Sequence, residues 1–359
     1  MAAYTTIDDS SAHFQTGLYV GTGSELVITN DGNSNLQPDL MWIKNRTDGS
    51  TNHHWHDTTR GTTVTLFGNK TDAEETQAQS VKSVQSDGFT LGTWDGNNID
   101  DKNFVAWQWK ATSGTTTTNT TGNGIDSVIQ ANAPAGFSIV TYTGNGTQSG
   151  QTVGHGLGAV PKMIISKDRN ASSNVPHWRV YHEAVGNTKY LDLTATSAAS
   201  DFNDWDDTTP TSTVYSVGGA GGYTPTNTNN TPYVAYLFAD VQGYSKFGTY
   251  TGNGNASGPV VYTGFKPAFV LVKCIDAAGE WQIYDHKRPG YNFPNYNLSP
   301  NNATAEYQGA SYHNMDILSN GFKILLTDVA VNTVAKKYMY AAFAENPFVT
   351  STGIPTTAR

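Results

Sequence analysis

The run Tyr142-Thr143-Gly144-Asn145-Gly146 occurs in two variants elsewhere in the 359-residue chain, as Tyr19-Val20-Gly21-Thr22-Gly23 and Tyr250-Thr251-Gly252-Asn253-Gly254. A proline that leads into an apolar run ending in lysine follows the three tyrosines after 19, 19 and 17 residues. Repetition of this kind has to be recognised before single motifs are interpreted, because it decides the fold. The three runs therefore predict three similar units in one chain.

Three further landmarks occur in the same order in each unit. The proline-to-lysine run comes first, a tryptophan follows, and an aromatic-rich strand comes last. Their positions are Pro38 to Lys44, Pro161 to Lys167 and Pro267 to Lys273; Trp55, Trp178 and Trp281; and residues 104–109, 233–238 and 338–343. Four landmarks at similar spacings predict three tandem homologous modules, in which the three tryptophans are equivalent and mostly buried.

Each module is predicted to be an antiparallel β-sandwich of the lectin or jelly-roll type. Short stretches alternate apolar and polar residues between turns rich in Gly, Asn and Asp. The pairs Asp87-Gly88 and Asn320-Gly321 are typical of tight hairpins, because they tolerate a positive φ. The expected fold class is all-β, with one short helix-like stretch over residues 72–84.

Composition sets the expected module boundaries. We expect module one at residues 1–111, a Thr- and Gly-rich linker at 112–124, module two at 125–243, module three at 244–348 and a C-terminal tail at 349–359. Residues 112–122 include no apolar side chain, whereas the boundary between modules two and three is short. Modules two and three are therefore expected to dock rigidly, and module one to be hinged or separately placed.

Composition also narrows the class of protein. Charged residues make up 14% of the chain, while 48 Thr, 31 Asn and 36 Gly favour strands and turns. The formal net charge of −9 argues against binding to nucleic acid or to anionic membranes. The single cysteine, Cys274, excludes an internal disulfide and a cysteine-based zinc site. No apolar stretch approaches the ~20 residues of a membrane span, so we expect no membrane insertion and synthesis in a reducing cytoplasm.

The densest acidic run is Asp201-Phe202-Asn203-Asp204-Trp205-Asp206-Asp207. Closely spaced carboxylates could hold Ca²⁺, which takes about 6–8 oxygen ligands, although the pattern of an EF-hand is missing. Trp205 could instead stack on a sugar ring, and a merely solvated acidic loop is the third alternative. Because binding groups concentrate on loops, the candidate glycan- or receptor-binding residues are Asp201, Asp204, Trp205, Asp206 and Asp207.

Two other motifs are interpreted as structural. Strand alternation would place His54 and His56 on one face, where a third ligand could complete a metal site. The matching stretches of the other modules lack this histidine pair, so no metal is expected. Each Gly-x-Gly lacks the third glycine and the following helix of a dinucleotide site, and is expected in a β-turn. The sequence predicts no catalytic residue, no metal and no cofactor.

Six stretches of the chain have a recognisable pattern, namely residues 37–46, 86–92, 104–111, 135–144, 154–161 and 338–348. These stretches resemble repeated modules of marine bacteriophage structural proteins. The run His155-Gly156-Leu157-Gly158 occurs in module two only, and modules one and three depart from it. The resemblance implies lectin-like sandwich modules in a virion or tail-fibre-like component, and it carries no catalytic residues.

The sequence as a whole therefore predicts a non-enzymatic bacteriophage virion structural protein on a tail fibre, tail tip or capsid surface. The expected partners are other phage virion proteins, a host-surface glycan and further copies of the chain, with a homotrimer favoured by analogy with fibres. The alternative is a carbohydrate-binding lectin or a glycan-active enzyme on the same scaffold. An enzyme would need one module with a cleft that carries two facing carboxylates.

Overall fold

The computed structural model describes residues 4–171, 177–288, 296–308 and 314–356. In this part of the chain, helix is confined to α1 (Asp95–Asn98) and to two 3₁₀ turns, η1 (Ser10–Ala12) and η2 (Ala133–Ala135). The sheets are antiparallel apart from one parallel strand pair among the described residues, and the all-β class is confirmed. None of the helices in the described ranges has the length and apolar character that a membrane span requires.

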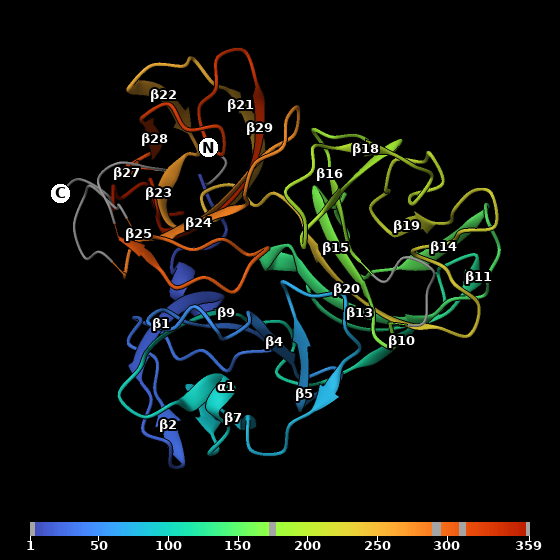
Figure 1. Cartoon of the computed structure of the whole chain (residues 1–359), viewed down its shortest axis with the longest axis horizontal. Coiled ribbons are helices and arrows are strands. Elements are labelled where there is room, and N and C mark those ends of the chain that lie inside the picture. The colour runs from blue at the N-terminus through green and yellow to red at the C-terminus, as the bar shows by residue number, and fades with distance from the viewer. Residues whose placement is uncertain (1–3, 172–176, 289–295, 309–313, 357–359) are drawn as a thin grey trace.

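Module one contains a six-stranded and a three-stranded sheet (Figure 1). The larger sheet has the order β1 (Phe14–Val20), β9 (Asn103–Trp109), β3 (Leu40–Asn45), β4 (His54–Asp57), β5 (Gly61–Phe67) and β6 (Glu75–Thr76). The smaller sheet has the order β2 (Leu26–Ile28), β8 (Gly88–Leu91) and β7 (Val81–Gln85). Met41, Ile43 and Phe89 belong to the apolar core between the two sheets.

Module two has the largest sheet of the described chain and a second, three-stranded sheet. The order of the large sheet is β10 (Thr117–Asn119), β12 (Ser127–Asn132), β13 (Phe137–Thr143), β20 (Pro232–Phe238), β15 (Met163–Asp168), β16 (Trp178–His182), β17 (Lys189–Asp192) and β18 (Ser200–Asp201). The small sheet has the order β11 (Gly124–Ile125), β14 (Gln151–Gly154) and β19 (Val214–Val217). Their apolar side chains form a second core.

Module three follows the same plan, but its larger sheet has fewer strands than those of modules one and two. Its larger sheet has the order β21 (Ser245–Thr251), β29 (Lys337–Pro347), β23 (Phe265–Cys274) and β24 (Gln282–Asp285). The facing sheet has the order β22 (Ser257–Tyr262), β28 (Gly321–Leu325) and β27 (Met315–Leu318), and β25 (Tyr296–Asn297) pairs with β26 (Tyr307–Gln308). Cys274 is buried in the core of this module, as the apolar run around it indicates.

Four strands have the same order in each large sheet. They are β1-β9-β3-β4 in module one, β13-β20-β15-β16 in module two and β21-β29-β23-β24 in module three. The pairing register agrees as well, since the last residue of β4, β16 and β24 pairs with Leu40, Met163 and Phe269, each two residues after the landmark proline. The strand order and the register thus recur three times in the chain.

The tyrosine of each Tyr-x-Gly-x-Gly run stacks on the first aromatic residue of the aromatic-rich strand. The ring centroids are 5.0 Å apart in every pair, and the interplanar angles are 4°, 9° and 9°. The pairs are Tyr19 with Phe104, Tyr142 with Tyr233, and Tyr250 with Tyr338. The two landmarks therefore define one repeated contact between neighbouring strands.

The first glycine of each run is explained by a close backbone approach. A Cβ on Gly144 would lie 2.3 Å from the carbonyl oxygen of Thr228, a distance that no side chain tolerates. The next backbone N–H, of Asn145, donates to the buried Asn227 side chain at 2.9 Å. The same arrangement links Gly21 with Asn98 and Gly252 with Asn332. These contacts account for the glycines without any bound phosphate.

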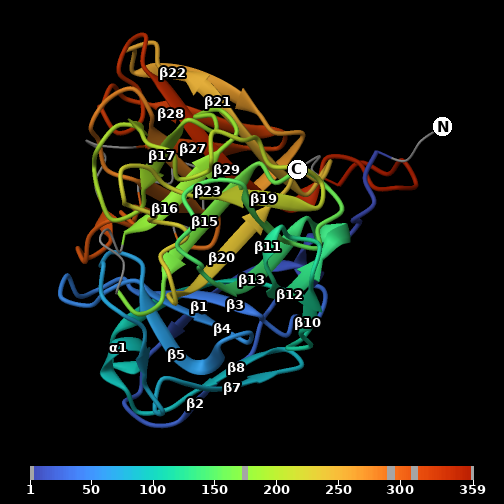
Figure 2. The same cartoon turned by 90° about the vertical axis from the view of Figure 1, so that its right-hand side faces the viewer.

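The faces of the three large sheets that point away from their own sandwiches meet in one shared core (Figures 1 and 2). Alternation along β3 sends Leu40 and Trp42 into this core, while Met41 and Ile43 point into the sandwich. Strands buried on both faces give continuous apolar runs. The equivalent side chains in the shared core are Leu40, Met163 and Phe269; Trp42, Ile165 and Leu271; and Trp109, Phe238 and Phe343.

A buried lysine bridges each of the three contacts between modules. We call these contacts the first seam (modules one and two), the second seam (two and three) and the third seam (three and one). The lysine of each proline-led strand donates to a backbone carbonyl of the neighbouring module, and burial lowers its pKa to about 8. The pairs are Lys167 with Thr71 at 3.3 Å, Lys273 with Thr196 at 2.9 Å and Lys44 with Ala303 at 3.2 Å.

Two of the seams also contain a buried ionic network. At the first seam, Arg60 forms ion pairs with Asp57, the last residue of β4, and with Glu74. Glu74 in turn pairs with Arg169 of module two. The third seam repeats this network with Arg288, Asp285, Glu306 and Arg46. At the second seam three of the four corresponding places are apolar, occupied by Val185, Ala199 and Ile275, and the place of Asp57 and Asp285 is taken by the buried His182. The three modules therefore form a closed ring with three heterologous seams.

This ring corrects two expectations about domain organisation. Module one is not hinged, because it shares the central core and contacts both neighbours. Residues 112–124 are not a free linker either, since they contribute β10 and the start of β11 to the sheets of module two. The backbone N–H groups of Ser113 and Gly114 donate to the buried carboxylate of Asp39. A polar segment without apolar residues is thus ordered by hydrogen bonds rather than by burial.

The three landmark tryptophans are buried, but Trp55 is not the equivalent of the other two. Trp178 and Trp281 stand four residues before the last residue of β16 and β24, whose registers agree. In module one the residue at that position is His53, directly before β4, and Trp55 lies two residues further on. A shift of two keeps a side chain on the same face of a strand. Trp55 therefore reaches the shared core from a different position.

One local expectation was wrong. Residues 72–84 form strand β6 and most of β7 rather than a helix. The stretch carries Val81 into the core of module one, and the β7–β8 hairpin turns at Asp87-Gly88 as expected. Weak helical propensity is overridden here by pairing with β8.

Candidate functional site

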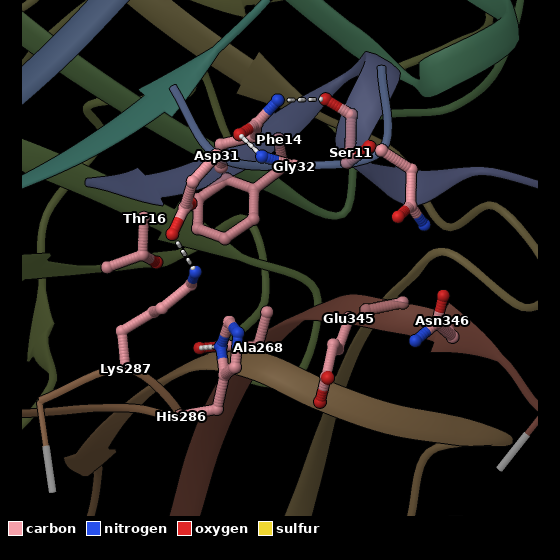
Figure 3. A pocket seen from close by; sticks show the side chains of 13 residues that line it. Ser11, Phe14, Thr16, Asp31, Gly32, Ala268, His286, Lys287, Glu345 and Asn346 are labelled. Carbon is pink, nitrogen blue, oxygen red and sulfur yellow. Dashed lines mark hydrogen bonds and ion pairs between the residues drawn. The ribbon is translucent and has the colours of Figure 1, made fainter. Parts of the chain in front are cut away.

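A pocket of about 230 Å³ lies at the third seam. Module one contributes strand β1 and the loop after β2, and module three contributes the ends of β23, β24 and β29. In Figure 3 Phe14 and Asp31 lie in the upper half of the view, and His286, Lys287 and Glu345 lie below them. The lining that carries the chemistry consists of Phe14, Gln15, Thr16, Asp31, His286, Lys287, Glu345 and Asn346.

The loop that bears Asp31 is fixed by the carboxamide of Gln15. Its oxygen accepts from the backbone N–H of Gly32 at 2.9 Å, and its nitrogen donates to the carbonyls of Ser34 and Ser11 at 2.8 and 2.9 Å. A Cβ on Gly32 would lie 2.6 Å from this carboxamide, so a larger residue there would have to displace the Gln15 side chain from its hydrogen bonds. The loop is thereby held against β1, with Asp31 at the edge of the pocket.

Charges of both signs line the third-seam pocket. Asp31 forms an ion pair with Lys287 at 2.7 Å across the seam, and Glu345 pairs with Lys266 at 2.5 Å. The Nδ1 atom of His286 lies 3.2 Å from the carbonyl oxygen of Ala268 and donates to it, so Nε2 is left as the acceptor in the neutral ring. With its carboxylates already paired, the pocket suits a polar ligand without net charge.

A buried hydroxyl group is the unusual feature of this pocket. Thr16 is buried on β1, on the same face as Phe14, and its Oγ1 has no hydrogen-bond partner among the described residues. Modules two and three place Ile139 and Phe247, both in the shared core, at the same distance before their landmark tyrosine. Leaving a buried hydroxyl unpaired costs roughly 1–3 kcal/mol, which a ligand in the pocket could offset.

A second groove lies where the N-terminal segment and the end of module two meet module three. The groove has a volume of about 490 Å³. Tyr262 is 63% exposed, and Tyr4 donates a hydrogen bond to the carbonyl of Gly264 at 2.6 Å. Asp240 and Lys246 form an ion pair at 3.0 Å in the same groove. An exposed aromatic ring beside polar groups is typical of a surface that contacts sugars or partner proteins.

The structure corrects the expectation that Trp205 is an exposed stacking ring. Trp205 is 1% exposed and packs edge-to-face on Tyr181, with ring centroids 5.8 Å apart, in the core of module two. Asp204 is also buried, 3.4 Å from Arg179, and burial raises the pKa of its carboxyl group to about 6. These two residues support the sandwich rather than a surface site.

The remaining acidic candidates are at the surface but have separate partners. Asp201 is exposed and pairs with Lys189 at 3.1 Å, and the carboxylate of Asp206 accepts from the backbone N–H of Gly150 at 2.7 Å. Asp207 is exposed, and its carbonyl accepts from the side chain of Asn187 at 2.7 Å. In the described ranges no group of three or more His, Cys, Asp or Glu side chains is arranged to hold a metal ion. Calcium binding by this run therefore stays without structural support.

The histidine run of module one is buried in the protein interior. His54 and His56 do share one face of β4, as strand alternation predicts, and burial lowers the pKa of each ring to about 3. Nε2 of His56 lies within hydrogen-bonding distance of Ser80 and Asn97. Both rings are thus neutral and belong to the polar part of the sandwich interior.

Sequence reasoning did not identify the third-seam pocket. Its walls come from residues 11–33 and from residues 268–346, which no local pattern connects. One signal was present in the repeat alignment, since Thr16 stands three residues before Tyr19 where the other modules have Ile139 and Phe247. A hydroxyl at a position that the repeat otherwise fills with apolar residues marks a departure from the common core.

The fold defines an all-β protein of antiparallel sandwiches joined into a closed ring. The chain belongs to the family of a domain of unknown function designated DUF7483, whose model matches residues 9–347. The matched range extends over all three modules, so the family domain corresponds to the whole ring. No curated protein and no solved structure matches the chain.

Proposed function

We propose that the chain is a non-enzymatic structural protein of a bacteriophage virion, located on a tail fibre, a tail tip or the capsid surface. In this proposal its three tandem sandwich modules are homologous and form a rigid platform. The observation that carries the proposal is the closed ring, in which every module contacts both others through the shared core and the buried seams. A ring of this kind suits a permanent subunit of a virion, because it is rigid without any partner protein.

The use of the buried charges supports a structural role. Asp57, Glu74, Asp285 and Glu306 are committed to arginines at the seams, where they stabilise module contacts. A glycosidase would instead keep two carboxylates free and facing each other across a cleft. The two carboxylates of the third-seam pocket, Asp31 and Glu345, are both paired with lysines. The geometry therefore favours scaffolding and binding over hydrolysis.

The proposed partners are other virion proteins, further copies of this chain and a host-surface glycan. Fibres contain three subunits, and one chain of this protein already contains three modules. A homotrimer would therefore place nine sandwiches around its axis. Sedimentation of the purified protein separates a 38.6 kDa monomer from a trimer. Association in solution or in the particle supports the oligomer, and a monomer without a large interface in the particle contradicts it.

Locating the protein in the particle tests the virion proposal. Particles of the source phage would be purified by density gradient and labelled with gold-conjugated antibody raised against the chain. We expect label at one structural position, together with peptides of the chain in the mass spectrum of the particles. A chain found only in the lysate and never in washed particles would overturn the proposal.

A carbohydrate-binding lectin is the second candidate, and the two polar pockets favour it. A lectin binds its sugar without the rest of a virion, whereas a purely architectural component binds none. A glycan array with the purified chain separates these roles. Release of reducing sugars from a bound glycan would identify the glycan-active enzyme instead.

A further inference from the structure

The third-seam pocket has a counterpart at the first seam that is filled by the chain itself. The backbone N–H of His286 donates to the carbonyl of Ala268 at 3.1 Å, as that of Thr58 donates to Asp39 at 2.9 Å. His286 and Lys287 of module three therefore correspond to Thr58 and Thr59 of module one. At the first seam a side chain from module two forms hydrogen bonds to both of these residues.

That side chain is Gln130 on β12. Its carboxamide nitrogen donates to the hydroxyl groups of Thr58 and Thr59, both at 2.9 Å. Its carboxamide oxygen accepts from the hydroxyl group of Thr112 and the backbone N–H of Gly114, both at 3.1 Å. A neutral amide thus fills the first seam at this place, with both its nitrogen and its oxygen paired.

The third seam has no equivalent of Gln130. In module one β1 is the edge strand of its sheet, whereas in module two β12 pairs alongside β13. Among the described residues, Asp31 contacts Lys287 in the corresponding place. A volume of about 230 Å³ is left beside it, and Thr16, whose hydroxyl is unpaired and shielded from solvent, is one of the lining residues. The third seam therefore has the same frame as the first but no group of its own to fill it.

We infer that the third-seam pocket binds one N-acetylhexosamine residue, with the acetamido group in the place that the Gln130 carboxamide takes at the first seam. An acetamido group supplies one N–H donor and one carbonyl acceptor, which match an acceptor such as Nε2 of His286 and a donor such as the hydroxyl of Thr16. The Phe14 ring adds an apolar wall for the acetyl methyl group. The volume fits one sugar unit rather than a drug-sized ligand.

This inference deepens the host-glycan part of the proposed function and rests on it. Absence of the protein from virions would overturn the proposed function and leave the sugar titration intact. Failure to bind the sugar would overturn the inference and leave the location of the protein in the particle intact. The two outcomes are therefore distinguishable.

The test is a calorimetric or NMR titration of the full chain with two matched probes. Methyl N-acetylglucosaminide and methyl glucoside differ only at the acetamido group. We expect the first to bind and the second to bind at least tenfold more weakly, which corresponds to about 1.4 kcal/mol. Equal affinity for the two probes, or no binding of either, would overturn the inference.

Two variants locate the site. Thr16→Val removes the unpaired hydroxyl with little change in shape, so the protein should remain folded and its Kd for the acetamido sugar should rise roughly fivefold. Asp31→Asn, at an exposed position, provides a second change at the same pocket and should also weaken binding. The control is Tyr262→Ala in the other groove, which should leave the Kd unchanged. Loss of binding in Tyr262→Ala, with no effect of Thr16→Val, would move the sugar to that groove and reject the third-seam pocket.

Discussion

Glu306 of module three binds Arg46 of module one through both carboxylate oxygens, at 3.1 and 2.9 Å, although 260 positions separate the two residues. The same carboxylate also accepts from Arg288 at 3.0 Å, and its side chain is fully buried. The contact joins the last module to the first and closes the ring. Unfolding of one module would leave charged groups in the neighbouring module without their partners.

Removing this carboxylate should destabilise the whole ring. Glu306→Gln leaves the buried Arg288 and the partly exposed Arg46 short of a counter-charge, and breaking a buried ion pair costs about 3–5 kcal/mol. The matched control is Glu25→Gln, whose exposed ion pair with Lys82 should contribute less than about 1 kcal/mol. Urea unfolding of both variants measures the difference. A loss below about 1 kcal/mol in Glu306→Gln would show that the network does not hold the third seam.

The three seam lysines should make stability rise with pH in the alkaline range. Their pKa is lowered to about 8 in the folded protein from an ordinary value of 10.5. Between these values the unfolded chain holds a proton that the folded chain has lost, so the free energy of unfolding increases with pH. Each lysine contributes at most about 1.4 kcal/mol per pH unit. Above pH 10 the buried tyrosines, such as Tyr181 with a pKa raised to about 12, oppose the trend.

Urea unfolding at pH 7, 8, 9 and 10 would measure this slope. We expect a shallower slope between pH 8 and 10 in Lys273→Met, because one of the three titrating groups is gone. Lys189→Met is the control, since Lys189 lies at the surface in an exposed ion pair. A wild-type free energy that is flat or falls between pH 8 and 10 would contradict the titration of the seam lysines.

The indole N–H group should contribute more to the free energy of unfolding in Trp178 than in Trp55. The Nε1 atom of Trp178 donates across the first seam to the carbonyl of Phe67 at 2.9 Å, whereas that of Trp55 has no partner among the described residues. Trp178→Phe should therefore cost about 1 kcal/mol more than Trp55→Phe, beyond the loss of ring volume that the two share. Thermal unfolding of the pair checks this. An equal cost would mean that the hydrogen bond adds nothing to the first seam.

Trp205→Ala should act on stability rather than on recognition. Removal of a large buried aromatic side chain costs about 3–5 kcal/mol, so the melting temperature should fall strongly. Asp207→Ala, two residues away at the surface, should leave the melting temperature within about 1 °C of the wild type. Any loss of host adsorption in Trp205→Ala should follow the fraction of unfolded protein. Lost adsorption by a variant with an unchanged melting temperature would restore Trp205 as a binding residue.

Local signals in the sequence were sufficient for the all-β class, but they did not predict the contacts between the repeated landmarks. The proline-led runs indicated central strands, because apolar patterning acts over a few residues. The turns expected at the Tyr-x-Gly-x-Gly runs are not seen, since residues 144–146 have irregular backbone without a turn. The stack of Tyr142 on Tyr233 connects two of the recognised landmarks. The same reasoning failed for residues 72–84, where pairing with β8 overrides a weak local preference.

The position of the tryptophans shows where a repeat alignment becomes ambiguous. A shift of two residues keeps a side chain on the same face of a strand, so Trp55 satisfied the pattern although His53 holds the register position of Trp178. The burial of Trp55 was predictable whether Trp55 or His53 was aligned with Trp178, but the structural equivalence of Trp55 and Trp178 was not. Only the pairing of β4 with β3 distinguishes them.

The sequence by itself determined the all-β class, the threefold recurrence of its landmarks and the hairpin turns at Asp87-Gly88 and Asn320-Gly321. Only the tertiary structure decided that the three large sheets bury their second faces against each other, that Trp205 lies inward and that a pocket opens beside Thr16 at the third seam. Local patterns fix which residues face the same side of a strand, but not what that side packs against. That depends on contacts such as the one between Glu306 and Arg46, whose sequence separation leaves no trace in any local stretch.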